Sequence, residues 1–158
     1  MATDRRSPRF VASRGSGCDD LTFAVWTDGP QDGDAGPVLV SVTDFLIPTA
    51  RSRLRAWAQA PRMRRLCASM PGSLGFWLWV KPLRRRSGSV SVWRGRDDLR
   101  RFVDWPSHVE IMRRFRGAGE VTATTWWVER FDAAQVWAAA ERRLGGLDPE
   151  LGHPRVPQ

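Results

Sequence analysis

One segment of this sequence is expected to form a strand that is apolar on both of its faces, and it constrains the fold more than any other feature. Residues 74–82 read LGFWLWVKP, with leucine, phenylalanine or valine at every even position up to 80 and with Trp77 and Trp79 on the opposite side. A sheet with one face in water alternates apolar with polar residues. Helices are therefore expected to cover one face of this sheet, and a partner sheet or a ligand to cover the other.

The remaining apolar segments follow one another in a regular order. Further strands are expected at residues 38–47, 89–93 and 121–129. Helices are expected over residues 50–69 with a break at Pro61, from Asp97 or Asp98 to Phe115 with a break or kink at Pro106, and from Asp132 to the glycines at 145 and 146. This order predicts an α+β ferredoxin-like fold, βαββαβ, with an antiparallel four-stranded sheet, right-handed crossovers and an extra C-terminal helix.

Composition divides the chain into one domain and two ends. Residues 1–36 are expected to be a flexible N-terminal segment, in which the apolar run 21–26 is either a stray strand or a segment packed on the domain. Residues 37–146 are expected to form the ferredoxin-like domain, and residues 147–158 a flexible, proline-rich tail.

Charge and cysteine content narrow the classes of function. The net charge is +8, and Lys81 is the only lysine. A basic chain favours anionic partners, but the arginines are spread evenly rather than gathered in one patch. Cys18 and Cys67 belong to no C-x-x-C or Cys/His cluster, so neither a disulfide framework nor a zinc site is indicated, and a reducing, cytoplasmic setting is expected. No run of about 18 apolar residues occurs, so no membrane span is expected.

Several segments resemble a known family. Residues 89–103 (SVSVWRGRDDLRRFV), followed by Ser107–His108 and the arginine-rich 113–116, resemble the antibiotic biosynthesis monooxygenase-like proteins of the dimeric α+β barrel superfamily, most of all the spheroidene monooxygenase branch. The last strand, TTWWVERF at 124–131, is similar as well. The resemblance covers roughly residues 38–131. It implies a homodimer, an apolar pocket between sheet and helices, and oxygen chemistry on an apolar substrate.

The same resemblance implies roles for two residues. In some branches the barrel binds haem through a helix histidine, a role that would fall on His108, and a strand tryptophan that shapes the pocket would correspond to Trp93. Haem-degrading relatives also use an asparagine on the first strand, whereas this sequence contains no asparagine. The cofactor therefore stays open between haem and none.

His108 and Asp44 are the candidate catalytic residues. His108 shares a helix face with Ile111, Met112 and Phe115 and should point inward, where an imidazole can ligate a metal or haem or act as a base near neutral pH. The alternative is a core histidine with one hydrogen bond. Asp44 interrupts an apolar strand and would have a raised pKa if buried, as a base requires; the alternative is a position at the wet end of that strand.

Apolar side chains supply the expected substrate pocket. The sequence has nine tryptophans and no tyrosine. Adjacent Trp126 and Trp127 must face opposite sides of the sheet, so some of these rings can line a cavity, while others belong to the core or to a dimer interface. The residues expected in the pocket are Trp77, Trp79, Trp93, Met112 and Trp126.

Three functions remain open at this point. The first is a monooxygenase-like enzyme acting on an aromatic or isoprenoid-like small molecule, either with haem on His108 or with a base that deprotonates an electron-rich substrate. The second is a non-catalytic small-molecule-binding or accessory protein of the same fold. The third, nucleic-acid binding as in an RNA-recognition motif, ranks last because residues 87–93 lack the aromatic pattern which that module carries on its third strand. A metal site made only of protein ligands is not expected, because one of the two histidines, His153, lies in the tail.

Overall fold

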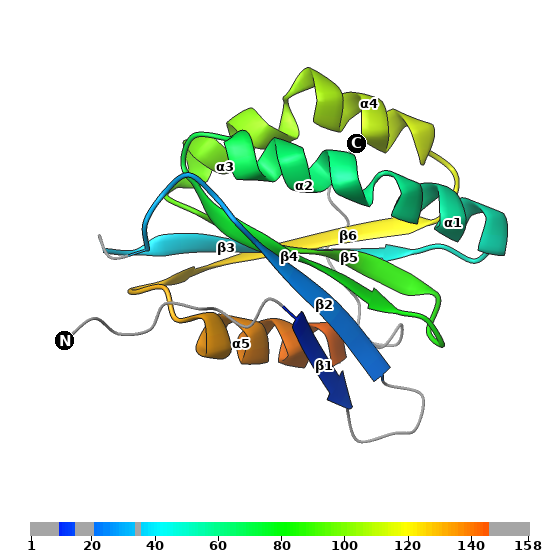
Figure 1. Ribbon diagram of the computed structural model, residues 1–158, viewed down its shortest axis with the longest axis horizontal. Helices are drawn as coiled ribbons and strands as arrows, with labels where there is room; N and C mark the ends of the chain where they lie inside the picture. Colours follow the sequence, from blue (N-terminus) through cyan, green and yellow to red (C-terminus); the bar gives the residue numbers. More distant parts are fainter. Residues whose placement is uncertain (1–9, 15–20, 34–35, 146–158) are drawn as a thin grey trace.

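Within the residues that the structure describes, six strands form one antiparallel sheet. The computed structural model describes residues 10–14, 21–33 and 36–145 (Figure 1). Across the sheet the strands run in the order β1-β2-β4-β5-β3-β6, and every neighbouring pair is antiparallel. The strands are β1 (Phe10–Arg14), β2 (Leu21–Asp28), β3 (Val38–Leu46), β4 (Ser73–Lys81), β5 (Arg86–Trp93) and β6 (Glu120–Val128).

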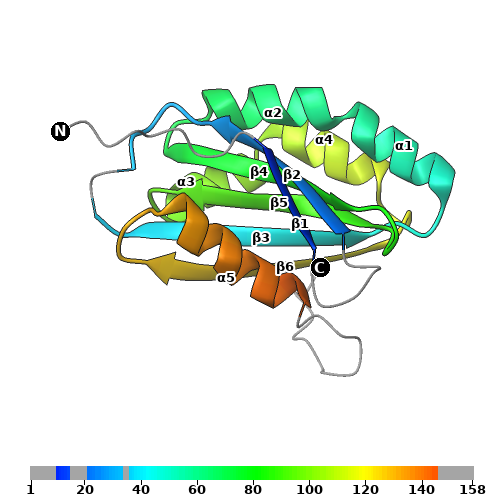
Figure 2. The same ribbon diagram turned by 60° about the horizontal axis from the view of Figure 1, so that its bottom comes forward.

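The described part of the chain has five helices, which cover the two faces of this sheet unequally. Four of them, from α1 to α4, lie on one face, and α5 lies alone on the other, as the two views show (Figures 1 and 2). The helices are α1 (Ala50–Ala58), α2 (Ala60–Ser69), α3 (Arg96–Val103), α4 (Pro106–Arg114) and α5 (Ala133–Gly145). In the part of the chain that the structure describes, no helix is long and apolar enough to cross a bilayer.

The expected ferredoxin-like fold is confirmed in strands β3 to β6 and the helices between them. Proline sets both helix breaks, because its ring fixes φ and removes a backbone donor, so it is tolerated only in a first turn. Pro61 accordingly lies in the first turn of α2, and Pro106 in that of α4. The cap expected at Asp132 is also present, since its Oδ1 accepts a 2.9 Å hydrogen bond from the backbone N–H of Gln135.

Two parts of the N-terminal segment form strands. Residues 21–28 form β2, which pairs with β4 along its length, and residues 10–14 form β1 beyond it. Pairing with β4 gives the apolar run at 21–26 a buried face, and local sequence does not specify β4 as its partner. The expected tail at 147–158 and Cys18 lie outside the described residues.

The sheet face opposite α1–α4 is covered by α5 of the same chain, whereas the sequence left a partner sheet or a ligand as its cover. Trp77 and Trp79 from β4 and Trp137 from α5 are buried in this core. Trp77 packs between Trp26 and Trp137, with ring centroids 4.2 and 5.6 Å away. The homodimer stays a prediction. Edge strand β6 leaves Val121 and Trp127 exposed, which a partner would bury.

A bulge in β4 corrects one detail of the expected side-chain pattern. The pairing with β5 shifts between Ser73 and Gly75, where Gly75 has φ +145°. A Cβ atom there would approach the ring of Trp26 within 2.3 Å. The bulge turns Leu74 toward the α5 side, into the same core as Trp77, whereas strict alternation would place it with Phe76.

Candidate functional site

A cavity of about 340 Å³ lies between the sheet and helices α1 to α4. Strands β3 to β6 form its floor, and the helices form its walls and roof. The apolar lining consists chiefly of Met63, Phe76, Leu78, Leu99, Phe102, Ile111, Met112 and Phe115. None of the described lining residues carries a formal charge. Such a cavity suits a small apolar molecule, which is held by burial and oriented by a few polar groups.

Hydroxyl groups form a patch on the floor of the cavity. Ser41 on β3 lies beside Ser91 on β5 and Thr125 on β6, and in the next row Thr43 lies beside Ser89. All five line the cavity. Sequence reasoning missed this patch, although the alternation of serine or threonine with valine in SVSV (89–92) and VSVT (40–43) was a signal that one sheet face bears hydroxyls.

His108 stands on α4 and lines the same cavity. Its Nδ1 lies 3.0 Å from the backbone oxygen of Val103. Since a carbonyl oxygen can only accept, Nδ1 carries the proton and Nε2 keeps its lone pair. The ring is tilted against that of Phe102 at 4.6 Å between centroids. Burial lowers the pKa of His108 below 6.5, and the bond to Val103 opposes this more weakly. At neutral pH the imidazole is therefore an uncharged base.

Cys67, on α2, also contributes to the cavity wall, but it is not a nucleophile. Burial raises the pKa of its thiol to about 12. The reactive form of cysteine is the thiolate, which is scarce at neutral pH for such a thiol. Cys67 therefore serves as a small apolar side chain.

Asp44 lies on the other face of the sheet and is absent from the cavity lining. It is buried and forms a two-point ion pair with Arg86: Nε donates to Oδ1 at 3.1 Å, and Nη2 donates to Oδ2. Arg86 also reaches the carbonyl oxygen of Leu144 on α5 at 3.4 Å. Asp44 is thus buried rather than at a solvent-exposed strand end. Its carboxylate pairs with Arg86 on the face of the sheet away from the cavity.

Of the expected pocket residues, the structure brings Met112 and Trp79 to the cavity. Trp79 contributes to the lining although it belongs to the α5-side core. Trp93 is fully buried behind Phe102, with ring centroids 5.0 Å apart, and is not among the described lining residues. Trp77 and Trp126 lie on the α5 side, where the Arg143 guanidinium covers the Trp126 ring at 3.9 Å.

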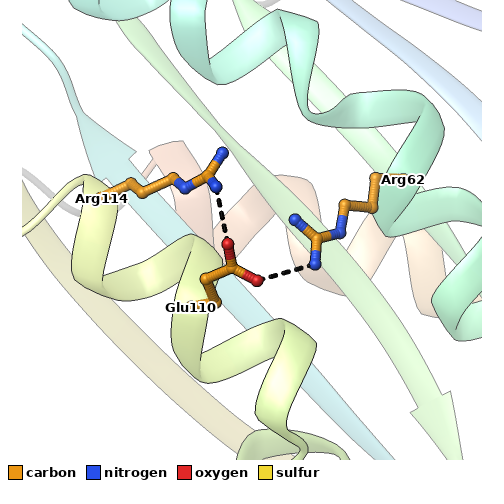
Figure 3. A network of polar contacts seen from close by, with 3 residues as sticks. All are labelled: Arg62, Glu110 and Arg114. Carbon is orange, nitrogen blue, oxygen red and sulfur yellow. Dashed lines mark hydrogen bonds and ion pairs between the residues drawn. The ribbon is translucent and has the colours of Figure 1, made fainter.

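An ion-pair network joins two of the helices that cover the cavity. Glu110 on α4 accepts from Arg62 on α2 at 2.9 Å and from Arg114, one turn further along α4, at 2.6 Å (Figure 3). The hydrogen bond from Arg62, together with the positive charges of both arginines, lowers the pKa of Glu110. All three side chains are substantially exposed, so the network fixes geometry more than it adds stability.

The described residues contain no cluster of three or more histidine, cysteine, aspartate or glutamate side chains that could hold a metal ion. Among the described residues, His108 is the one that would hold haem in the role that the family resemblance implies. Its Nδ1 is fixed by Val103, the arrangement that orients a ligating imidazole, and its Nε2 is free to bind iron.

The fold and this cavity define a class: an α+β protein of ferredoxin-like fold with an apolar cavity between its sheet and one helical layer. No protein-family model and no curated protein matches the sequence. Solved structures with the same fold do exist. A ferredoxin-fold protein from Listeria monocytogenes, described as related to antibiotic biosynthesis monooxygenases, matches with a TM-score of 0.52 and 10% identity, covering 74% of this chain and 70% of its own.

Two candidate monooxygenases give similar matches. The one from Fusobacterium nucleatum has a TM-score of 0.54 and 8% identity, over 71% of this chain and 53% of its own. The one from Lactobacillus acidophilus has a TM-score of 0.52 and 14% identity, over 69% and 54%. The resemblance to antibiotic biosynthesis monooxygenase-like proteins is confirmed at the level of the fold.

Proposed function

We propose that this protein is a monooxygenase-like enzyme that oxidises a hydroxylated aromatic molecule bound in the cavity between the sheet and helices α1 to α4. The observation that carries this proposal is the neutral imidazole of His108 in the wall of an otherwise apolar cavity. A histidine held this way is a general base with its free nitrogen available to a bound hydroxyl group. The fold that this chain shares with candidate monooxygenases supports the same reading.

The chemistry needs a base and a dry site. His108 Nε2 takes the proton of the substrate hydroxyl, and the electron-rich oxide that results gives one electron to molecular oxygen. The superoxide so formed joins the substrate radical at a ring carbon, and the peroxide loses water to leave a quinone. In sum, one phenol and one O₂ give one quinone and one H₂O. The substrate supplies all four electrons, so no other reductant is required.

The hydroxyl patch has a role in this scheme. Ser41, Ser89 and Thr125 can donate hydrogen bonds to the substrate oxide from the rigid floor, whereas the Ser91 hydroxyl donates to the backbone oxygen of Ser41. Fixed donors in a low-dielectric cavity stabilise a developing negative charge far better than mobile water does. The apolar walls favour the flat ring of the substrate by burial.

Haem is the alternative cofactor, and His108 would hold it. A bound haem would supply oxygen binding and electron transfer at its iron. The cavity residues would then exclude water and hold the proton on Nδ1 of His108. Titration with haemin distinguishes the two cases: a Soret shift that disappears in His108→Ala supports haem, and its absence supports the cofactor-free scheme.

Oxygen uptake by the purified protein tests the proposal directly. We expect consumption of O₂, with one quinone formed per O₂, when hydroxylated two- and three-ring aromatics are added. His108→Gln should lower the rate by about 10²- to 10⁴-fold while leaving ligand binding nearly unchanged. Val109→Ala, on the same helix but outside the cavity lining, is the matched control. Saturable binding with no turnover across the panel would favour a binding protein and refute the enzyme.

A further inference from the structure

A second cavity, of about 360 Å³, adjoins the first where α1 meets the end of α4. Its lining is Arg55, Ala58, Gln59, Arg114 and Phe115. Gln59 and Phe115 also line the cavity between the sheet and helices α1 to α4, called the main cavity below, so the two spaces adjoin at these residues.

The two cavities differ in charge. None of the described residues that line the main cavity is ionic, whereas the lining of the second cavity includes two arginines, Arg55 and Arg114. Arg114 shares the carboxylate of Glu110 with Arg62 (Figure 3). Three arginines against one glutamate leave two positive charges at this end of the site. Within the described residues, the guanidinium of Arg55 has no ion pair.

We propose that Arg55 and Arg114 bind a carboxylate group of a ligand whose apolar body occupies the main cavity. Guanidinium groups match the planar, two-point geometry of a carboxylate. A carboxylate cannot enter the apolar cavity without a large desolvation cost, so it stays at the charged end and fixes the orientation of the ring. This inference rests on the proposed function and names the substrate class as a hydroxylated aromatic acid.

A pair of matched probes tests the carboxylate site. Naphthol and hydroxynaphthoic acid differ by one carboxylate, and their binding can be followed by tryptophan fluorescence. Two exposed ion pairs predict that the acid binds about 3- to 20-fold more tightly than the neutral probe at low salt. Arg55→Met with Arg114→Met should bring this ratio to about 1 without changing naphthol affinity. Arg96→Met with Arg100→Met, an equal loss of two charges on α3 outside both linings, should leave the ratio unchanged.

Glu110→Gln gives a prediction of opposite sign. Removing this carboxylate frees Arg62 and Arg114, so the affinity for the acid should rise and the affinity for naphthol should not. A ratio that the double arginine variant leaves intact would overturn the proposal. Equal affinities for the two probes in the unaltered protein would overturn it as well, if the double arginine variant also leaves haemin binding unchanged.

Haem also carries carboxylates, and a separate measurement of haemin binding shows whether haem is the ligand of this site. If haemin binding, followed by its Soret band, falls in the double arginine variant while the two naphthalene probes bind equally, the carboxylates bound are those of haem. Oxygen uptake is measured independently. If naphthol is turned over and the acid does not bind more tightly than naphthol, only the carboxylate site is refuted. If the acid binds more tightly but neither probe is turned over, only the proposed enzymatic activity is refuted.

Discussion

Replacing Arg86 with an apolar residue should lower the free energy of unfolding more than replacing its partner Asp44. The Asp44 side chain is 5% exposed and that of Arg86 20%. In Arg86→Met the carboxylate of Asp44 stays buried without its counter-ion, and breaking a buried pair in this way costs about 3–5 kcal/mol. Because water can reach the partly exposed side of the pair, we expect the lower end, about 3 kcal/mol. For a domain of this size, that lowers Tm by about 6–12 °C.

The reverse change is expected to be milder. In Asp44→Leu the guanidinium of Arg86 can turn toward water and keep its bond to the Leu144 carbonyl. The loss should be about 1–2 kcal/mol, within the usual range for single substitutions. The double variant should recover stability relative to Arg86→Met, since an apolar pair can replace a buried ion pair without loss.

Urea unfolding followed by tryptophan fluorescence measures these differences, with the m-value showing whether the native or denatured state has changed. Oxygen uptake by Asp44→Leu is the functional control, and it should be unaltered, because Asp44 faces away from the cavity. A stable Asp44→Leu variant that has lost turnover would refute this reasoning and restore Asp44 as a catalytic base. Equal costs for the two single variants would refute the stated asymmetry.

Three further predictions follow from the site and the core. The rate of the proposed reaction should rise with pH through a pKa below 6.5 and then level off, because His108 must be neutral to act as a base. Protonation of His108 in the unfolded chain should also lower the free energy of unfolding as pH falls below 6.5, which urea titrations at several pH values would detect. Cys67, with its pKa near 12, should resist iodoacetamide in the folded protein and react on unfolding, as peptide mass spectrometry would show. Trp137→Ala should cost about 3–5 kcal/mol in urea unfolding, because it leaves a hole between α5 and Trp77; a cost below about 1 kcal/mol would mean that α5 is not needed to cover the sheet.

Much of the fold could be predicted because its signals are local. Proline at 61 and 106 acts on the residues beside it, and the Asp132 cap spans three residues. The inward position of His108 likewise follows from helical spacing, because Ile111 and Met112 lie three and four residues further along and share its face of the helix. The order of strands β3 to β6 followed from these local signals together with the handedness of crossovers.

The candidate site could be predicted only in part. His108 and Met112 were found because a helix face can be read from the sequence. The hydroxyl patch was missed because it joins β3, β5 and β6, whose residues come together only through sheet register. Trp77 and Trp126 were misplaced relative to the cavity, since alternation says which side chains share a face but not which face the helices α1 to α4 will cover.

The sequence by itself determined the elements, their order and the need to cover both faces of the central strands, because periodicity, proline and capping residues act over a few positions. Only the tertiary structure decided that α5 covers the second face, that β2 joins the sheet, and that Asp44 meets Arg86 42 residues away. It also decided that Arg55 and Arg114 line the same cavity. Such contacts depend on how whole elements pack, and no local pattern specifies which distant surfaces will meet.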